Sequence, residues 1–138
     1  MKTKMKKAVL IIIALITISN SLCSQLILTI EITGIKNNTG NLMLQLLDID
    51  HKIISQQMMP ADKNKCTFII KDLKPDRYAV QYYHDENLSM ELEKNRLGKP
   101  LEGYGFSNNV TAPFSMPPFE KWIFELKEDK KLQLKITY

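Results

Sequence analysis

Residues that could carry chemistry gather in one segment of the chain, residues 83–109, which reads YHDENLSMELEKNRLGKPLEGYGFSNN. From Asp85 onward, side-chain oxygens fall at alternate positions, and this spacing suits a hard cation such as calcium. A calcium loop of the helix–loop–helix type has glycine where this chain has Met90, and a bidentate acidic residue where it has Arg96. A solvated polar loop is therefore the favoured interpretation. The alternative is a degenerate calcium site with the ligands Asp85, Asn87, Ser89 and Glu93.

Acid–base chemistry has one candidate constellation, in which His84 is a base and Asp85 or Glu102 orients it. Adjacent residues on a strand point to opposite faces, however, and a histidine at a strand end is more often bonded to the loop that follows. His51 and His84 are the only histidines, and neither has a cysteine at ligand spacing, so a structural zinc site has little support. Cys66 is interpreted as a small core residue. We assign no catalytic residue, and a hydrolase that uses His84 and Glu102 is the least favoured alternative.

The connection from Asp85 to Pro118 has no clear strand periodicity over roughly thirty residues, and loops of this length in compact domains are often functional. Its glycines at GYGFSNN are expected to permit tight backbone turns, while the aromatic side chains between them anchor the loop. The residues predicted to form this binding loop are His84, Asp85, Asn87, Glu102, Tyr104, Phe106, Asn108 and Asn109.

The elements that must position this loop are strands, because apolar residues alternate with polar ones in most of the chain. LILTIEITG and GNLMLQLLD both alternate, and the asparagine- and glycine-rich KNNTGN between them predicts a hairpin. Further strands are expected in KIISQQMM, CTFIIKDL, RYAVQYYHD, FEKWIFELK and KLQLKITY. The Leu-x-Pro turn before Tyr78 indicates a tyrosine corner, in which that side chain packs over the turn.

This pattern predicts an all-β protein, with no helix of ordinary length and no second domain. Residues 25–138 should form a single antiparallel β-sandwich, immunoglobulin-like or prealbumin-like, of about seven strands with one long inserted loop. The chain is long enough for a core, since 44% of its 138 residues are hydrophobic.

Residues 1–24 are predicted to be a secretory signal peptide. A lysine-rich start is followed by an apolar run from Ala8 to Ile16, too short to span a bilayer, and then by small and polar residues. Removal of this segment leaves fifteen basic residues (nineteen less four) against fifteen acidic ones, so the basic charge gives no support for nucleic-acid binding. We expect a periplasmic or extracellular protein without a transmembrane segment after cleavage. Lipoprotein anchoring through Cys23 is less favoured because the bulky Leu22 precedes it.

Three segments together, DLKPDRYAVQYYHDEN, LGKPLEGYGFSNN and PPFEKWIFEL, resemble a bacterial family of exported proteins, domain of unknown function 2141. The resemblance implies a small secreted or periplasmic β-sandwich with no assigned activity. The usual family loop is close to His-Asp-x-Asn-Gly-Asn-Gly-x-x-Asp. Here Leu88 and Met90 replace the two glycines, Ser89 replaces asparagine and Glu93 replaces aspartate. The resemblance therefore implies that any cation site in this loop is weakened or absent, since the oxygens are kept but the backbone freedom is lost.

The leading functional hypothesis is a non-enzymatic binding or structural module of the cell envelope, which uses the 85–118 loop. Its partner would be an envelope protein or a glycan, and no cofactor is expected. A calcium-stabilised structural domain is the alternative.

Overall fold

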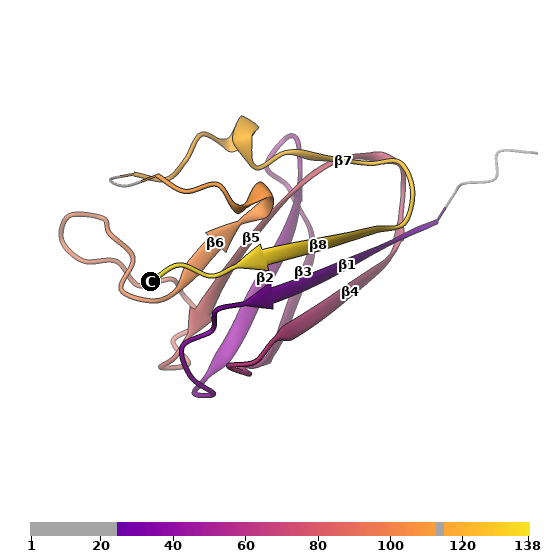
Figure 1. Ribbon diagram of the computed structural model, residues 1–138. Coiled ribbons are helices and arrows are strands. Elements are labelled where there is room, and N and C mark those ends of the chain that lie inside the picture. Colours follow the sequence, from indigo (N-terminus) through magenta and orange to yellow (C-terminus); the bar gives the residue numbers. More distant parts are fainter. Residues whose placement is uncertain (1–24, 113–114) are drawn as a thin grey trace, which may run out of the picture.

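The computed structural model describes residues 25–112 and 115–138, and it contains two β-sheets packed face to face (Figure 1). The predicted signal peptide and Cys23 lie outside the described residues. The strands are β1 (Leu26–Thr33), β2 (Asn41–Asp48), β3 (Ile53–Pro60), β4 (Cys66–Leu73), β5 (Asp76–Asp85), β6 (Tyr104–Phe106), β7 (Phe124–Leu126) and β8 (Lys130–Lys135). The 3₁₀ turns are η1 (Ser107–Asn109) and η2 (Phe119–Lys121).

The smaller sheet has the strand order β4-β1-β8, and the larger has the order β3-β2-β5-β6, with β7 also paired to β5. All of these pairings are antiparallel except that of β1 with β8, which run side by side in the same direction in Figure 1. The predicted all-β sandwich is confirmed. It has eight strands in the described residues instead of about seven, and one of its pairings is parallel.

The predicted hairpin between β1 and β2 is wrong. β1 pairs with β4 and β8, whereas β2 pairs with β3 and β5 in the other sheet. The connection between β1 and β2 crosses from one sheet to the other, and its Ile35 is buried in the core. Alternation fixes which residues of a strand face the core, but it does not say which sheet the strand joins.

The core lies between the two sheets and is built from the apolar rows that the alternation predicts. Leu28, Ile30 and Ile32 of β1 are fully buried, and so are the leucines at alternate positions of β2, Leu42, Leu44 and Leu46. Each such side chain contributes about 1.5–3 kcal/mol when it is removed from water, so these two rows account for much of the stabilisation.

The predicted tyrosine corner is confirmed. The buried Tyr78 donates its hydroxyl hydrogen bond to the main-chain oxygen of Lys74, at 3.0 Å, across the turn between β4 and β5. Cys66 is buried at the start of β4, as expected of a core residue, and burial raises the pKa of its thiol.

The predicted single loop from Asp85 to Pro118 is in fact divided. Tyr104–Phe106 forms β6 on the edge of β5, and η1 follows directly, so the connection consists of two loops, 86–103 and 110–118. Both loops project from the same end of the sandwich (Figure 1). A three-residue strand with glycine at its centre is too short to give an alternating signal, which is why the sequence does not predict it.

A second, smaller core lies on the outer face of the larger sheet. Ala79, Phe106 and Trp122 are buried there, and the rings of Phe106 and Trp122 stack with centroids 4.0 Å apart. Tyr104, Val110 and Phe119 pack around them. This cluster fixes β6 and the residues after it to the sheet. Among the described residues, no helix has the length and apolar character that crossing a membrane requires.

Candidate functional site

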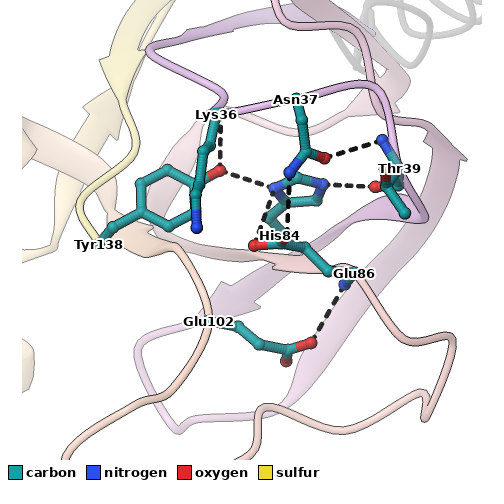
Figure 2. A network of polar contacts seen from close by, with 7 residues as sticks. All are labelled: Lys36, Asn37, Thr39, His84, Glu86, Glu102 and Tyr138. Atoms are coloured by element: carbon teal, nitrogen blue, oxygen red, sulfur yellow. Dashed lines mark hydrogen bonds and ion pairs between the residues drawn. The ribbon is translucent and has the colours of Figure 1, made fainter.

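His84 is completely buried at the end of β5, and both of its ring nitrogens have partners (Figure 2). Nε2 lies 2.6 Å from the main-chain oxygen of Thr39, and Nδ1 lies 2.6 Å from the hydroxyl of Tyr138. A carbonyl oxygen can only accept, so Nε2 carries the proton and Nδ1 accepts from Tyr138. The same hydroxyl accepts the N–H of Lys36 at 2.9 Å. This arrangement ties together the β1–β2 connection, β5 and the end of the chain.

Glu102 is also buried, but it contacts a different part of the network. Its Oε1 accepts the N–H of Glu86 at 3.1 Å, while its Oε2 has no hydrogen-bond partner among the described residues. Burial raises the pKa of this carboxyl, the main-chain N–H groups of Glu86 and Glu93 oppose the rise, and the negative charges of Asp85 and Glu93 add to it. In Figure 2, the Glu102 carboxylate meets the backbone of Glu86 and does not meet the ring of His84.

The proposed base and orienter are therefore not assembled as a pair. No hydrogen bond or ion pair in the described part of the chain joins His84 to Glu102, and the nitrogens of His84 are already engaged by Thr39 and Tyr138. A general base must have a free nitrogen within reach of a substrate proton. The geometry instead makes His84 a structural residue, as the strand-end argument expected.

Asp85 is fully buried and organises the turn that follows it. Its Oδ1 accepts the N–H of Ser89 at 2.9 Å, and its Oδ2 accepts the N–H of Met90 at 3.0 Å. Asn87 accepts the N–H of Ser89 as well, at 3.0 Å. Leu88 and Met90 adopt left-handed backbone conformations, with φ of 61° and 66°. The turn thus holds two left-handed residues without glycine.

The four oxygens predicted as calcium ligands are largely used within this turn. Asp85 and Asn87 accept main-chain N–H groups, and the hydroxyl of Ser89 donates to the main-chain oxygen of Glu91 at 3.0 Å. In residues 25–112 and 115–138, no group of three or more His, Cys, Asp or Glu side chains has the arrangement to hold a metal ion. The feature that points toward a cation is the partnerless Oε2 of Glu102.

Ser107, Asn108 and Asn109 hydrogen-bond the main chain of neighbouring segments, and we call these three residues the latch. The buried Ser107 hydroxyl accepts the N–H of Val80 at 2.9 Å and donates to the main-chain oxygen of Trp122 at 2.5 Å. Asn108 donates to two main-chain oxygens, those of Lys121 and Ile123, at 2.9 and 3.0 Å.

Asn109 bonds β8 in the other sheet. Its amide donates to the main-chain oxygen of Gln133 at 3.1 Å, and its oxygen accepts the N–H of Lys135 at 2.8 Å. Asn108 and Asn109 both have positive φ, 62° and 51°, which asparagine tolerates better than most residues. The only sequence signal of this segment is asparagine in a glycine-rich context, and that signal does not distinguish a latch from a ligand site.

The two glycines around Tyr104 do not form the tight turns that the sequence suggests. Neither has a positive φ, and both leave room for an aromatic ring. A β-carbon on Gly105 would lie 2.3 Å from the ring of Tyr82, and one on Gly103 would lie 2.5 Å from the ring of Tyr138. Both glycines therefore allow the backbone to lie directly against an aromatic side chain.

A groove lies where the two loops meet above β6. Its volume is about 250 Å³. The lining residues come from the first loop (Leu92, Lys94, Asn95, Leu97, Gly98, Lys99 and Pro100), from β6 (Tyr104 and Phe106) and from the second loop (Ala112, Ser115 and Met116). Leu97 is 92% exposed and Met116 is 55% exposed, so apolar side chains stand open to solvent along this groove.

Of the predicted binding residues, only Tyr104 and Phe106 line the groove. The others serve the interior or the latch, as described above. The predicted set lacks the other lining residues, which are Leu92, Lys94, Asn95, Leu97, Gly98, Lys99, Pro100, Ala112, Ser115 and Met116. For the first loop, the only sequence signal is the pair of leucines among cations in LEKNRLGKP, a pattern equally compatible with a solvated loop.

A family model described as an uncharacterized protein conserved in bacteria, DUF2141, matches residues 30–134. This match extends from β1 to β8 and includes both walls of the groove. Searches of the curated proteins and of the solved structures gave no match. The chain therefore belongs to the DUF2141 family of uncharacterised bacterial proteins.

Proposed function

We propose that this protein is a non-enzymatic binding domain that takes a small apolar ligand in the groove above β6. The observation that carries this proposal is the set of exposed apolar side chains around an aromatic floor, with Leu97 at 92% exposure beside Tyr104 and Phe106. An exposed leucine alone needs no explanation, but an apolar groove with several such side chains marks a binding site more often than a random surface.

The floor of the groove is rigid enough to present a fixed shape. Phe106 stacks on Trp122, and Tyr104 packs edge to face against Phe106 with centroids 5.9 Å apart. Tyr104 is also held through its backbone, which exchanges two hydrogen bonds of 2.8 Å with Thr137. A site whose side chains are already ordered loses less conformational entropy when a ligand binds.

Export is part of the proposal and rests on the sequence of residues 1–24. A role in the cell envelope, in the periplasm or outside the cell, is consistent with a domain whose stability depends on its core rather than on a disulfide bond. Cys66, the one cysteine in the described residues, is free and buried.

The proposal is tested by titrating the purified protein with decanol, a neutral aliphatic probe. Trp122 is the only tryptophan and stacks on Phe106, so its fluorescence should report occupation of the groove. We expect saturable binding that Leu97→Ser together with Met116→Ser weakens about tenfold, since less apolar surface is covered. The control is Ile69→Ser on β4, a half-exposed apolar residue of the other sheet. Binding that is absent, or equally affected by both sets of changes, would refute the groove as the site.

A calcium-stabilised structural domain is the second candidate, and the unpartnered Oε2 of Glu102 beside the charges of Asp85 and Glu93 favours it. A cation bound only by the folded state raises the melting temperature with its concentration. Thermal unfolding in EDTA and in millimolar calcium tests this candidate. The shift should disappear in both Asp85→Ala and Glu102→Gln, and no shift in the unaltered protein would eliminate it.

A further inference from the structure

We propose that the groove selects a single-chain amphiphile with an anionic head, such as a fatty acid, whose tail lies on Tyr104 and Phe106 and whose head lies between Lys94 and Lys99. This inference rests on the proposed function, since it names the class of ligand for the same groove. The lysines of the lining come from the first loop and its aromatic rings from β6, so the head is assigned to the loop and the tail to the strand.

The charged residues that line the groove are all positive. Its residues include Lys94 and Lys99 and no aspartate or glutamate. Glu93, the acid next to Lys94 in the chain, does not line the groove, and it lies near enough to Glu102 to raise the pKa of that carboxyl. Arg96 adds a third cation to the same loop.

These cations are also unpaired, as are most lysines of the described residues, whereas three lysines have carboxylate partners. Lys65 and Lys131 both pair with Glu31, and Lys127 pairs with Glu125. In the described ranges, no carboxylate lies within ion-pair distance of the lysines at 94 and 99 or the arginine at 96. An anionic group entering the groove would therefore meet positive charge that is not already neutralised.

The backbone of the first loop holds the two lysines in place. Asn95 accepts the N–H groups of Leu97 and Lys99, at 2.9 and 3.0 Å, through its side-chain oxygen. Its own N–H donates to the main-chain oxygen of Lys99 at 2.8 Å, and Lys94 forms a β-bridge with Pro100. The result is a closed turn with Leu97 at its tip and a lysine on each arm. The main chain that carries the two lysines is thus ordered by its own hydrogen bonds.

The size of the groove favours one aliphatic chain. Its volume of about 250 Å³ is at or below the lower end for small-molecule pockets. A stable protein partner would have to cover about 800 Å² on each side, well beyond this groove, and a two-chain lipid would need more room.

The test compares three probes with the same ten-carbon chain on the purified protein: decanoate, decanol and decyltrimethylammonium, each followed by Trp122 fluorescence and calorimetry. We expect decanoate to bind about tenfold more tightly than decanol, and the cationic probe to bind most weakly. Added salt should weaken the binding of decanoate and leave that of decanol nearly unchanged.

The matched variants are Lys94→Glu with Lys99→Glu, and, as a control, Lys71→Glu with Lys74→Glu at exposed positions on and beside β4. The variant with Lys94→Glu and Lys99→Glu should bind the cationic probe more tightly than decanoate, which reverses the order of affinities in the unaltered protein. The variant with Lys71→Glu and Lys74→Glu should keep the original order. Thermal unfolding establishes that both pairs remain folded.

Each outcome separates this inference from the proposed function. Equal binding of decanoate and decanol would overturn the charge selection and leave the apolar groove intact. Binding of none of the three probes would overturn both. Binding to vesicles of phosphatidylglycerol without binding of soluble decanoate would overturn the inference as well, because the surface would then recognise a membrane rather than a single amphiphile.

Discussion

The left-handed residues of the turn after Asp85 allow a test in which the sign of an effect, and not only its size, is fixed by the structure. Leu88 and Met90 have φ of 61° and 66°, a conformation that favours glycine. An L-residue in this conformation costs about 1–2 kcal/mol, which glycine avoids. At an ordinary backbone position, glycine lowers the free energy of unfolding by about 0.5–1 kcal/mol relative to alanine, because the unfolded chain is more flexible at glycine.

The comparison should be made between alanine and glycine variants, since both remove the half-exposed side chain and differ only in backbone freedom. Leu88→Gly should be more stable than Leu88→Ala by about 0.5–1 kcal/mol, and the same should hold for Met90→Gly against Met90→Ala. Leu97 in the same loop is exposed and has no positive φ, so Leu97→Gly should be less stable than Leu97→Ala by about 0.5–1 kcal/mol.

Urea unfolding of the six variants, followed by Trp122 fluorescence and by circular dichroism, gives the free energies. In thermal unfolding, the difference at residue 88 or 90 corresponds to a rise of about 2–6 °C for a domain of this size. The reasoning fails if glycine is no better than alanine at residues 88 and 90, or if residue 97 gives the same sign. Either result would mean that the backbone of this turn is not held in the left-handed conformation by Asp85.

Three further predictions concern the buried network and β6. Tyr138→Phe should cost about 1–3 kcal/mol in urea unfolding because His84 and the N–H of Lys36 lose their partner, whereas Tyr83→Phe, at an exposed hydrogen bond to Met90, should cost clearly less. Gly105→Ala should lose about 1–3 kcal/mol because its β-carbon would overlap Tyr82; a neutral result would refute the close approach. The raised pKa of Glu102 means that the folded protein holds its proton more tightly than the unfolded chain, so this carboxyl stabilises the fold below its ordinary pKa and the contribution is lost as pH rises through the raised value. Glu102→Gln should therefore gain stability relative to the unaltered protein as pH increases from about 4 to 8, and parallel pH profiles would contradict this.

The sequence predicts the strands well because the pleat fixes a period of two in every strand that has one buried face. The rows of β1 and β2, the tyrosine corner at Tyr78 and the buried Cys66 all follow from residue type and local spacing. The pairing of strands does not follow from the sequence, because a strand shows the same alternation in either sheet. The predicted hairpin of β1 with β2 is wrong for this reason. β6 was missed because three residues with Gly105 in the centre contain too little pattern.

The candidate site was harder to predict for a different physical reason. A groove made of two loops depends on contacts between residues far apart in the chain, such as Leu97 and Met116, and neither loop carries a local sign of the other. The polar residues of this segment suggested a reactive site, but buried polar groups of the main chain also need hydrogen-bond partners. A side chain that bonds to the main chain is of the same residue type as one that binds a ligand.

The polar residues can therefore support the groove by bonding to the main chain of its loops, without contacting a ligand. Asp85 and Glu102 bond the backbone at the base of the first loop, at Ser89, Met90 and Glu86, while the latch of Ser107 and Asn108 fixes the main chain at both ends of the second. Each wall is therefore held at its base by side-chain hydrogen bonds, which are part-buried at Asp85 and Glu102, buried at Ser107 and exposed at Asn108. The polar segment that first suggested catalysis is better understood as the support of the two loops.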